Sequence, residues 1–193
     1  GDTRMVVWGY PVEDKHYVVV GGDNSGGGYK ATRHLLETGR QKIAFFGNTN
    51  NPENAARHAG YIRALAEFGI NPDPELKIDI PFEMNRARDV ITDLLESRVE
   101  LDSVLCISDV IALATLSTLQ ELGFLVPKDI AVVGYDDISL AAYSSPPLTT
   151  VRQNIRHAGR ILVESVLGLI KGEDVPDAML ASDLVIRKST ALS

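Results

Sequence analysis

The stretch "YVVVGGDNSGGGYKATRHLL" (residues 17–36) runs from an apolar segment through glycines into a segment of helical period. Strand, glycine-rich loop and helix in this order hold phosphate in many nucleotide-binding proteins. Here the glycine run ends in "GGGYKA", with no hydroxyl residue after Lys30 as a P-loop requires. Asp23 also places a carboxylate where a phosphate would approach. The sequence therefore argues against a phosphate loop and favours a ligand with hydroxyl or amine groups, which can donate hydrogen bonds to a carboxylate.

Outward from this stretch, short apolar segments alternate with helical segments along the chain. Most of the apolar segments are continuously apolar, as strands covered on both faces are. The expected strands are 5–9, 17–21, 42–47, 76–80, 103–108 and 130–135. Helical period is clearest over 87–95 and 155–170, and Gly39, Gly69 and Gly123 stand where left-handed helix caps are expected. This alternation predicts an α/β fold with parallel sheets and right-handed crossovers.

Composition excludes several classes of function. The chain has 193 residues and a formal net charge of −7, so it is a poor nucleic-acid ligand by itself, because DNA binding rests on Lys and Arg at phosphates. Its one cysteine, Cys106, lies in an apolar run and is expected to be buried and unreactive. The sequence contains no signal peptide, no apolar segment of membrane-spanning length and no metal-ligand spacing among its histidines. No nucleophile elbow or acid–base pair stands out, so neither an enzyme nor a cofactor is indicated.

Ligands of parallel α/β sheets bind beyond the carboxyl ends of the strands. Polar residues follow four of the expected strands, namely Asp23, Gly47-Asn48, Ser108-Asp109 and Asp136-Asp137. Loop ends are polar in any case, so this pattern alone leaves a small-molecule site and simple solvation equally open.

Five longer stretches narrow the interpretation. They are "VVGGDNSGGGYKATRHLLETGRQKIAFFG" (19–47), "AARHAGYIRAL" (55–65), "CISDVIALATLSTLQELGFLVPKDIAVVGYDD" (106–137), "SSPPLTTVRQN" (144–154) and "LVIRKST" (184–190). In this order and spacing they resemble the effector-binding domain of the lactose-repressor/galactose-repressor family of bacterial transcription regulators. "VPKDIAVVGYDD" followed by "PPLTTVRQ" is highly specific to that family, and the resemblance covers nearly the whole chain. Periplasmic sugar-binding proteins share the fold but usually lack this pair.

The resemblance implies two α/β subdomains of periplasmic-binding-protein type, joined by three crossings of the chain with the effector between them. The N-terminal subdomain would hold 1–40 and 151–178, the C-terminal one 41–150 and 179–193, and the crossings would lie near Arg40, Val151 and Ala181. The family's helix-turn-helix headpiece has no counterpart here, and neither do its first two β-α units, roughly sixty residues. The resemblance therefore implies an incomplete N-terminal subdomain, with operator DNA bound only through the missing headpiece. It also implies a homodimer, to which the loop "SLAAYSSPP" (139–147) could contribute.

Three charged residues match family positions that hold the effector. Asp23 and Asp136 would accept hydrogen bonds from effector hydroxyls, and Arg57 would donate them. Asp23 could instead cap the helix that follows it, and Arg57 could be a solvated helix residue. We assign ligand binding to Asp23 and helix capping to Asn24 or Ser25.

Three further positions match the family's effector site. Phe82 stands where relatives place an aromatic ring, which could lie against a sugar or pack in the core. Ser108 stands where relatives often have Asn, and Gln153 would contact the effector or tie a crossing. Ile155 replaces an aromatic residue of some sugar-binding relatives. Beside these positions, we expect Asp137 to anchor its loop and Asp109 to cap the next helix.

The sequence thus predicts the effector-sensing module of a cytoplasmic transcriptional regulator, a repressor without metal or cofactor. The expected effector is a neutral mono- or disaccharide, because two carboxylates and one guanidinium suit hydroxyl groups better than an anion. The alternatives are a periplasmic sugar receptor of a transport system and an enzyme on the same kind of sheet.

Overall fold

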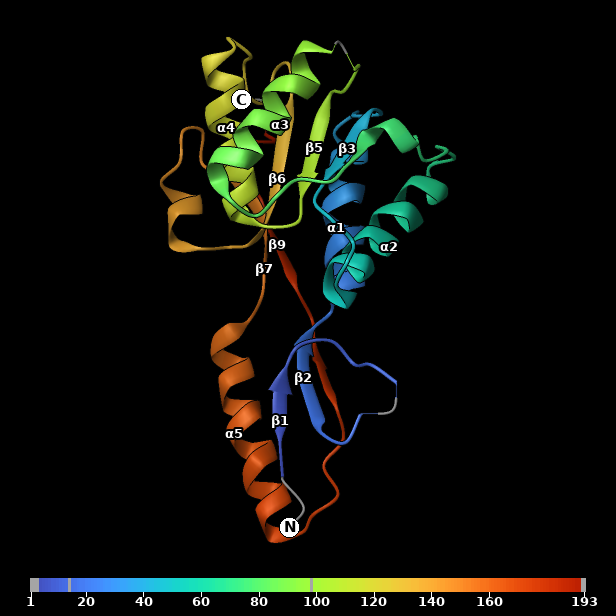
Figure 1. Ribbon diagram of the computed structural model, residues 1–193, viewed down its shortest axis with the longest axis vertical. Helices are drawn as coiled ribbons and strands as arrows, with labels where there is room; N and C mark the ends of the chain where they lie inside the picture. The colour runs from blue at the N-terminus through green and yellow to red at the C-terminus, as the bar shows by residue number, and fades with distance from the viewer. Residues whose placement is uncertain (1–3, 14, 98, 192–193) are drawn as a thin grey trace.

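The computed structural model describes residues 4–13, 15–97 and 99–191. These residues form two α/β units arranged along the long axis of the molecule (Figure 1). Within them, the larger unit contains a six-stranded sheet of order β4-β3-β5-β6-β7-β9, and the smaller unit a three-stranded sheet of order β1-β2-β8. The predicted division into two sheets is confirmed, as is the periplasmic-binding-protein-like α/β fold.

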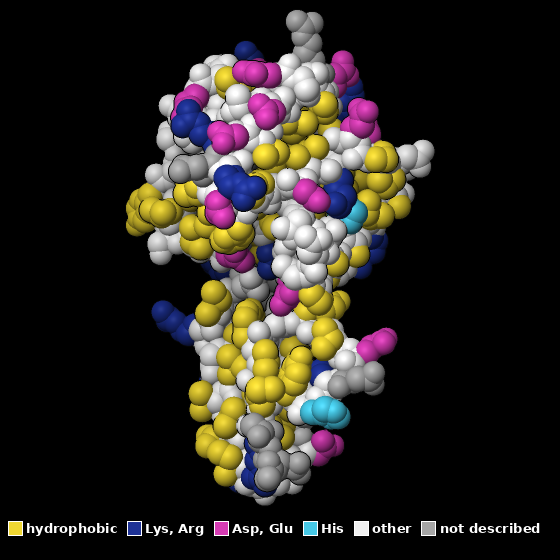
Figure 2. All heavy atoms as spheres, viewed as in Figure 1, with side chains coloured by type: hydrophobic (Ala, Val, Ile, Leu, Met, Phe, Trp, Pro, Cys, Tyr) yellow, Lys and Arg dark blue, Asp and Glu magenta, His cyan; other side chains and the backbone are white. Residues whose placement is uncertain are grey.

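The smaller unit consists of β1 (Val6–Trp8), β2 (Val18–Gly22), β8 (Ala178–Leu180) and α5 (Ile155–Lys171). Its strands are parallel, and α5 packs against β1 and β2. Figure 2 shows hydrophobic side chains spread over the visible face of this unit. Exposed large hydrophobic residues here include Met5, Val163, Leu167 and Met179. The unit therefore leaves much apolar surface uncovered in the described residues.

The larger unit contains five parallel strands: β3 (Ile43–Phe46), β4 (Lys77–Ile78), β5 (Ser103–Cys106), β6 (Ala131–Asp136) and β7 (Thr149–Arg152). Strand β9 (Asp183–Val185) closes one edge and runs antiparallel to β7. The other strand pairs of the described residues are parallel, as expected. The helices are α1 (Asn24–Glu37), α2 (Pro52–Glu67), α3 (Met84–Glu96) and α4 (Asp109–Glu121), with short 3-10 turns η1 (Pro74–Leu76) and η2 (Ser139–Ala142). Helices α1 and α2 pack together, and α3 and α4 form a second pair on the other side of β5 and β6 (Figure 1).

The core of the larger unit lies along its central strands. All residues of β3 and β5 are buried, as their continuously apolar sequences predict. Cys106 belongs to this core, and burial raises the pKa of its thiol to about 12. The expected burial of this cysteine is confirmed, and a raised pKa disfavours the reactive thiolate. No helix in the described part of the chain has the length and apolar character needed to cross a membrane.

The chain passes between the two units three times. It crosses at Asp23, between β2 and α1, then at 153–154, between β7 and α5, and again at 181–182, between β8 and β9. The crossing expected near Ala181 is there, whereas Val151 lies inside β7, two residues before the second crossing.

The crossing expected near Arg40 is wrong. Helix α1 precedes that residue, yet it packs on α2 and contacts β5, β7 and β9 of the larger unit. The family resemblance implied the later boundary, but the packing of α1 places the crossing before this helix. The smaller unit therefore holds 4–22 and 155–180, and the larger unit holds 24–152 and 183–191, leaving out the residues not described.

Candidate functional site

Asp23 lies at the first crossing and is itself the N-cap of α1. Its Oδ1 accepts a hydrogen bond from the Gly26 amide (2.8 Å), and its own amide donates to the Leu180 carbonyl (2.7 Å). The assignment of capping to Asn24 or Ser25 is therefore wrong, because the helix begins at Asn24 and the residue before it fills the cap position. Asp23 is nevertheless exposed, so its carboxylate is also within reach of a ligand.

Asn24 has a different role, which the sequence analysis missed. It is buried, its Nδ2 donates to the Gly22 carbonyl (3.1 Å), and its Oδ1 accepts from Nε of Arg57 (2.8 Å). Arg57 projects from α2 and also donates from Nη1 to the Ile107 carbonyl (2.5 Å). Its guanidinium carbon lies 3.8 Å from the centroid of the Tyr135 ring, a cation–π distance. The side chain of Arg57 is 12% exposed and is held by three separate parts of the larger unit.

The glycines of the opening stretch explain this close arrangement. A Cβ on Gly28 would overlap the backbone carbonyl of Arg57, and a Cβ on Gly60 of α2 would overlap that of Ser25. A Cβ on Gly27 would likewise collide with the Tyr135 hydroxyl. The glycine run therefore brings α1 against α2 and β6, which places Asn24 beside Arg57, and it does not form a phosphate loop.

Asp136 ends β6 at the edge of the sheet that faces the smaller unit. Its Oδ1 accepts from Nε2 of Gln153 (2.7 Å) and lies 4.0 Å from Nη2 of Arg57. Burial raises the pKa of Asp136 above its usual value, although the charge of Arg57 and the bond from Gln153 act in the opposite direction. Gln153 stands in the second crossing, so this bond joins the larger unit to the connection between the units.

A cavity of about 250 Å³ lies between the two units, next to Arg57 and Gln153. Arg57 and Gln153 line it together with Trp8, Gly9, Gly22, Asn24, Asn51, Glu53 and Asn54. Trp8 and Glu53 were not predicted as site residues. Trp8 ends β1 and is 40% exposed, so the strand-end rule could have found it. Glu53 stands in the first turn of α2, beyond the Gly47-Asn48 that this rule had selected.

Four predicted site residues, namely Asp23, Phe82, Ser108 and Asp136, are not among the residues that line the cavity. Asp136 nevertheless contacts Gln153 and Arg57, which do line it. Phe82 is 63% exposed in the segment before α3. Ser108 is buried and caps α4 by accepting a hydrogen bond from the Ile111 amide (3.3 Å). The expectation that Asp109 caps this helix is therefore wrong, since the helix begins at Asp109 and the preceding Ser108 fills the cap.

Asp137 anchors its loop, as expected. Its carboxylate accepts from Nε of Arg152 (2.6 Å) and from Nη2 of Arg187 (2.7 Å). Burial acts to raise the pKa of Asp137, but the hydrogen bonds and charges of these two arginines outweigh it and lower the pKa below its usual value. Because Arg152 ends β7 and Arg187 follows β9, Asp137 ties together the two strands adjoining the second and third crossings.

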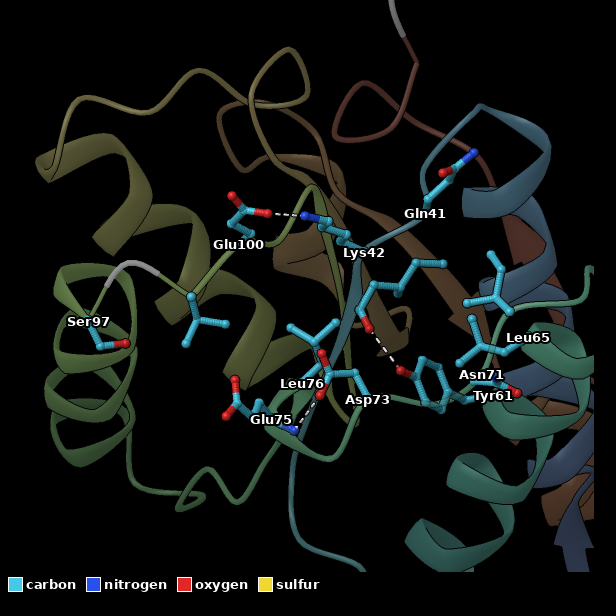
Figure 3. Close-up of a pocket in the computed structure, with 13 residues that line it drawn as sticks. Gln41, Lys42, Tyr61, Leu65, Asn71, Asp73, Glu75, Leu76, Ser97 and Glu100 are labelled. Atoms are coloured by element: carbon cyan, nitrogen blue, oxygen red, sulfur yellow. Dashed lines mark hydrogen bonds and ion pairs between the residues drawn. The ribbon is translucent and has the colours of Figure 1, made fainter.

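A larger cavity, of about 530 Å³, lies at the opposite ends of the strands of the six-stranded sheet (Figure 3). It is near Ile43 at the start of β3, where the Tyr61 hydroxyl donates to the Ile43 carbonyl (2.8 Å). Parallel sheets bind ligands at the carboxyl ends of their strands, and this cavity is at the amino ends. The smaller cavity at the crossings is therefore the candidate site.

The family follows from comparison with known sequences. The family described as "Periplasmic binding protein-like domain" matches residues 32–190. The chain belongs to this family.

Among curated relatives, the transcriptional repressor PurR of Aliivibrio salmonicida is 35% identical over 171 residues, which cover 88% of this chain and 51% of the relative. PurR of Vibrio atlanticus is 42% identical, covering 79% of this chain and 46% of the relative. The transcriptional regulator CelR of Thermobifida fusca is 35% identical, covering 94% and 54%. The chain thus spans about half the length of the curated relatives it matches.

Solved structures of transcriptional regulators also resemble this chain. A complex of the regulator CelR with cellobiose is 33% identical, with a TM-score of 0.86 over 95% of this chain and 58% of that one. A LacI-family regulator from Enterococcus faecium with bound ribose is 29% identical, with a TM-score of 0.86 over 97% of this chain and 70% of that one. The resemblance to the effector domain of LacI-family regulators is confirmed.

Proposed function

We propose that this chain is the effector-sensing domain of a LacI-type transcriptional regulator, and that the complete protein is a repressor. The observation that carries the proposal is the cavity at the crossings, which takes lining residues from both units and from Gln153 between them. A ligand held there touches both units at once and favours one relative orientation over another. The curated relatives are named as transcriptional regulators rather than enzymes, which favours binding over catalysis.

The proposed effector is a neutral mono- or disaccharide. Asp136 and the exposed Asp23 supply acceptors for hydroxyl pairs, and Arg57 supplies donors. Trp8 adds an aromatic ring to the cavity wall, and such rings suit the apolar face of a sugar. Relatives have been solved with cellobiose and with ribose, which supports the same chemistry here.

Regulation would follow from the change in orientation. Coupling between an effector site and a distant site is typically ~1–3 kcal/mol, enough to change operator affinity severalfold or more. In this proposal operator DNA is bound by a headpiece outside this chain, in a cytoplasmic homodimer. The names of the relatives, "HTH-type" repressors and regulators, support a DNA-binding segment of this kind.

Calorimetry on the full-length protein tests the effector assignment. The titrants are neutral saccharides including cellobiose and D-ribose, with a sugar phosphate, a sugar acid and a nucleobase as a second group. We expect a neutral saccharide to bind, and Arg57→Ala and Asp136→Ala each to weaken binding by ~1.5–3 kcal/mol, about tenfold or more. If only a nucleobase or an anion binds, the saccharide assignment is wrong.

The alternative, a periplasmic sugar receptor, makes a different prediction for DNA. Fluorescence anisotropy of the full-length protein with DNA from upstream of its own gene should show specific binding that the saccharide changes. Saccharide binding without any DNA binding would favour the receptor instead.

A further inference from the structure

The loop that follows β6 has an unusual backbone conformation. Asp136 has φ +108° and Asp137 has φ +54°, a region that residues other than glycine rarely adopt. Two such residues in succession persist only where the surrounding structure holds them in place. Since Asp136 contacts Gln153 and Arg57, which line the candidate site, whatever holds this loop also decides where the Asp136 carboxylate points.

Asp109 supplies a large part of that support. Its side chain is fully buried, with 0% of the residue exposed. Its Oδ2 accepts a hydrogen bond from the Ile138 amide (2.8 Å), and its Oδ1 accepts from the Thr150 hydroxyl (2.5 Å). The Thr150 hydroxyl in turn accepts from the Asp137 amide (3.4 Å). One carboxylate therefore joins the start of α4, the loop and β7.

Helix capping does not account for this arrangement. The helix that begins at Asp109 is already capped by Ser108. A buried carboxylate close to Asp136 and Asp137 is electrostatically unfavourable, and burial raises its pKa to about 6. The nearby groups that oppose this increase are Thr150 and the Ile138 amide, the two that connect Asp109 to the loop and to β7.

We propose that Asp109 is a positioning residue for the effector, which sets the Asp136 carboxylate through the Ile138 amide and the Thr150 hydroxyl. Since Thr150 lies two residues before the end of β7, the same contacts attach the loop to the strand that enters the second crossing. Effector contact at Asp136 is thereby joined mechanically to the connection between the units. The inference rests on the proposed function in taking Asp136 as an effector contact.

Hydrogen exchange in the full-length protein tests the support of the loop without any ligand. Asp109→Asn keeps the shape of the side chain but replaces one acceptor oxygen with an amide group. We expect backbone amides of residues 136–138 to exchange about tenfold faster or more, as the loss of a hydrogen bond to a charged group predicts. The matched control is Asp93→Asn, on the exposed face of α3. Unchanged exchange in Asp109→Asn would overturn the proposal.

A second pair of variants guards against misfolding of Asp109→Asn. Thr150→Val removes the hydroxyl at nearly constant volume, whereas Thr150→Ser retains it. We expect faster exchange of the loop amides in Thr150→Val and restoration to near the wild-type rate in Thr150→Ser. Equal rates in these two variants would show that the hydroxyl bridge does not hold the loop.

A double-mutant cycle tests whether Asp109 acts through Asp136. Calorimetry uses cellobiose and D-ribose as probes, in the presence and absence of Asp136→Asn. We expect Asp109→Asn to weaken binding about tenfold when Asp136 is present and by much less when it is not. An equal loss in both backgrounds would mean a general structural role. If neither sugar binds the wild-type protein, the effector assignment loses support, while the exchange experiments still decide the role of Asp109.

Discussion

At the scale of single residues, Asp136 combines a proposed binding role with an unfavourable backbone conformation. Its φ of +108° suits glycine better than any residue with a Cβ. We expect Asp136→Gly to be more stable than Asp136→Ala by about 1 kcal/mol, because only glycine relieves the strain. Both variants remove the carboxylate, so both should lose effector affinity alike. Urea unfolding of the two variants, with calorimetry alongside, measures the difference, and a glycine variant no more stable than the alanine variant would contradict it.

The raised pKa of Asp109 predicts how its contribution to the free energy of unfolding changes with pH. Its pKa is raised from 3.8 to about 6 in the folded protein, chiefly by burial, with Asp136 and Asp137 adding to the increase. A raised carboxyl pKa means that the folded state binds the proton more tightly than the unfolded state does. The contribution of this group is therefore fully present below pH 3.8 and is lost as the pH rises through about 6.

Comparing the wild-type protein with Asp109→Asn isolates the pH-dependent contribution of Asp109 to stability. The free energy of unfolding of the wild type, minus that of the variant, should fall by about 3 kcal/mol between about pH 3.5 and about pH 7. Denaturant unfolding at several pH values measures this difference and removes the effects of other titrating groups. A difference that stays constant, or that rises with pH, would contradict the assignment.

The family resemblance brought together residues that lie close to one another in the structure, whereas helix caps could not be assigned because they depend on the exact start of a helix. Arg57, Asp136 and Gln153 lie together at the crossings, as the resemblance implied. Ser108 and Asp109 both suit a helix cap, and only the helix boundary decides between them. Asn24 could not be assigned from its type, because its contact with Arg57 exists only once α1 has packed against α2.

At the scale of elements, the strands were predictable where they are long and buried. The six expected strands are all present, and β3, β5 and β6 coincide with continuously apolar segments. Strands β7, β8 and β9 were not predicted. Strand β7 has the sequence "TTVR", and β8 and β9 are short and partly exposed, so none carries the apolar signal of a central strand. Their pairing is decided by partners far away in the chain.

The contact between α1 and α2 depends on glycine at two points, Gly28 and Gly60. We expect Gly60→Ala to destabilise the protein by about 1–3 kcal/mol, because its Cβ meets the rigid backbone of Ser25. Effector affinity should fall as well, since the same contact sets Asn24 beside Arg57.

Gly159→Ala on α5 is the control, because a Cβ there meets nothing within 4 Å. It should raise stability by about 0.5–1 kcal/mol, since alanine favours helix. Thermal unfolding distinguishes the two, and equal effects would contradict this account of the packing.

At the scale of the whole molecule, the loop 139–147 offers a surface for the proposed homodimer. Leu140 is 63% exposed and Tyr143 is 85% exposed, so this loop presents two large apolar side chains to a partner. We expect the full-length protein to have twice the mass of its chain in light scattering. Tyr143→Asp should raise the dimer dissociation constant by about tenfold or more. Phe68→Asp, at the end of α2, is the control, since Phe68 is also exposed but lies outside this loop. A stable dimer with Tyr143→Asp would place the interface elsewhere.

The interleaving of the two units has a consequence for synthesis on the ribosome. The smaller unit needs β8 and the larger unit needs β9, and these two strands follow all the other strands of their sheets along the chain. Neither sheet can be completed while the nascent chain still ends before residue 178, although most of the central strands have long since left the exit tunnel. The two units therefore mature together, within the same few residues of translation, rather than one after the other as consecutive domains do.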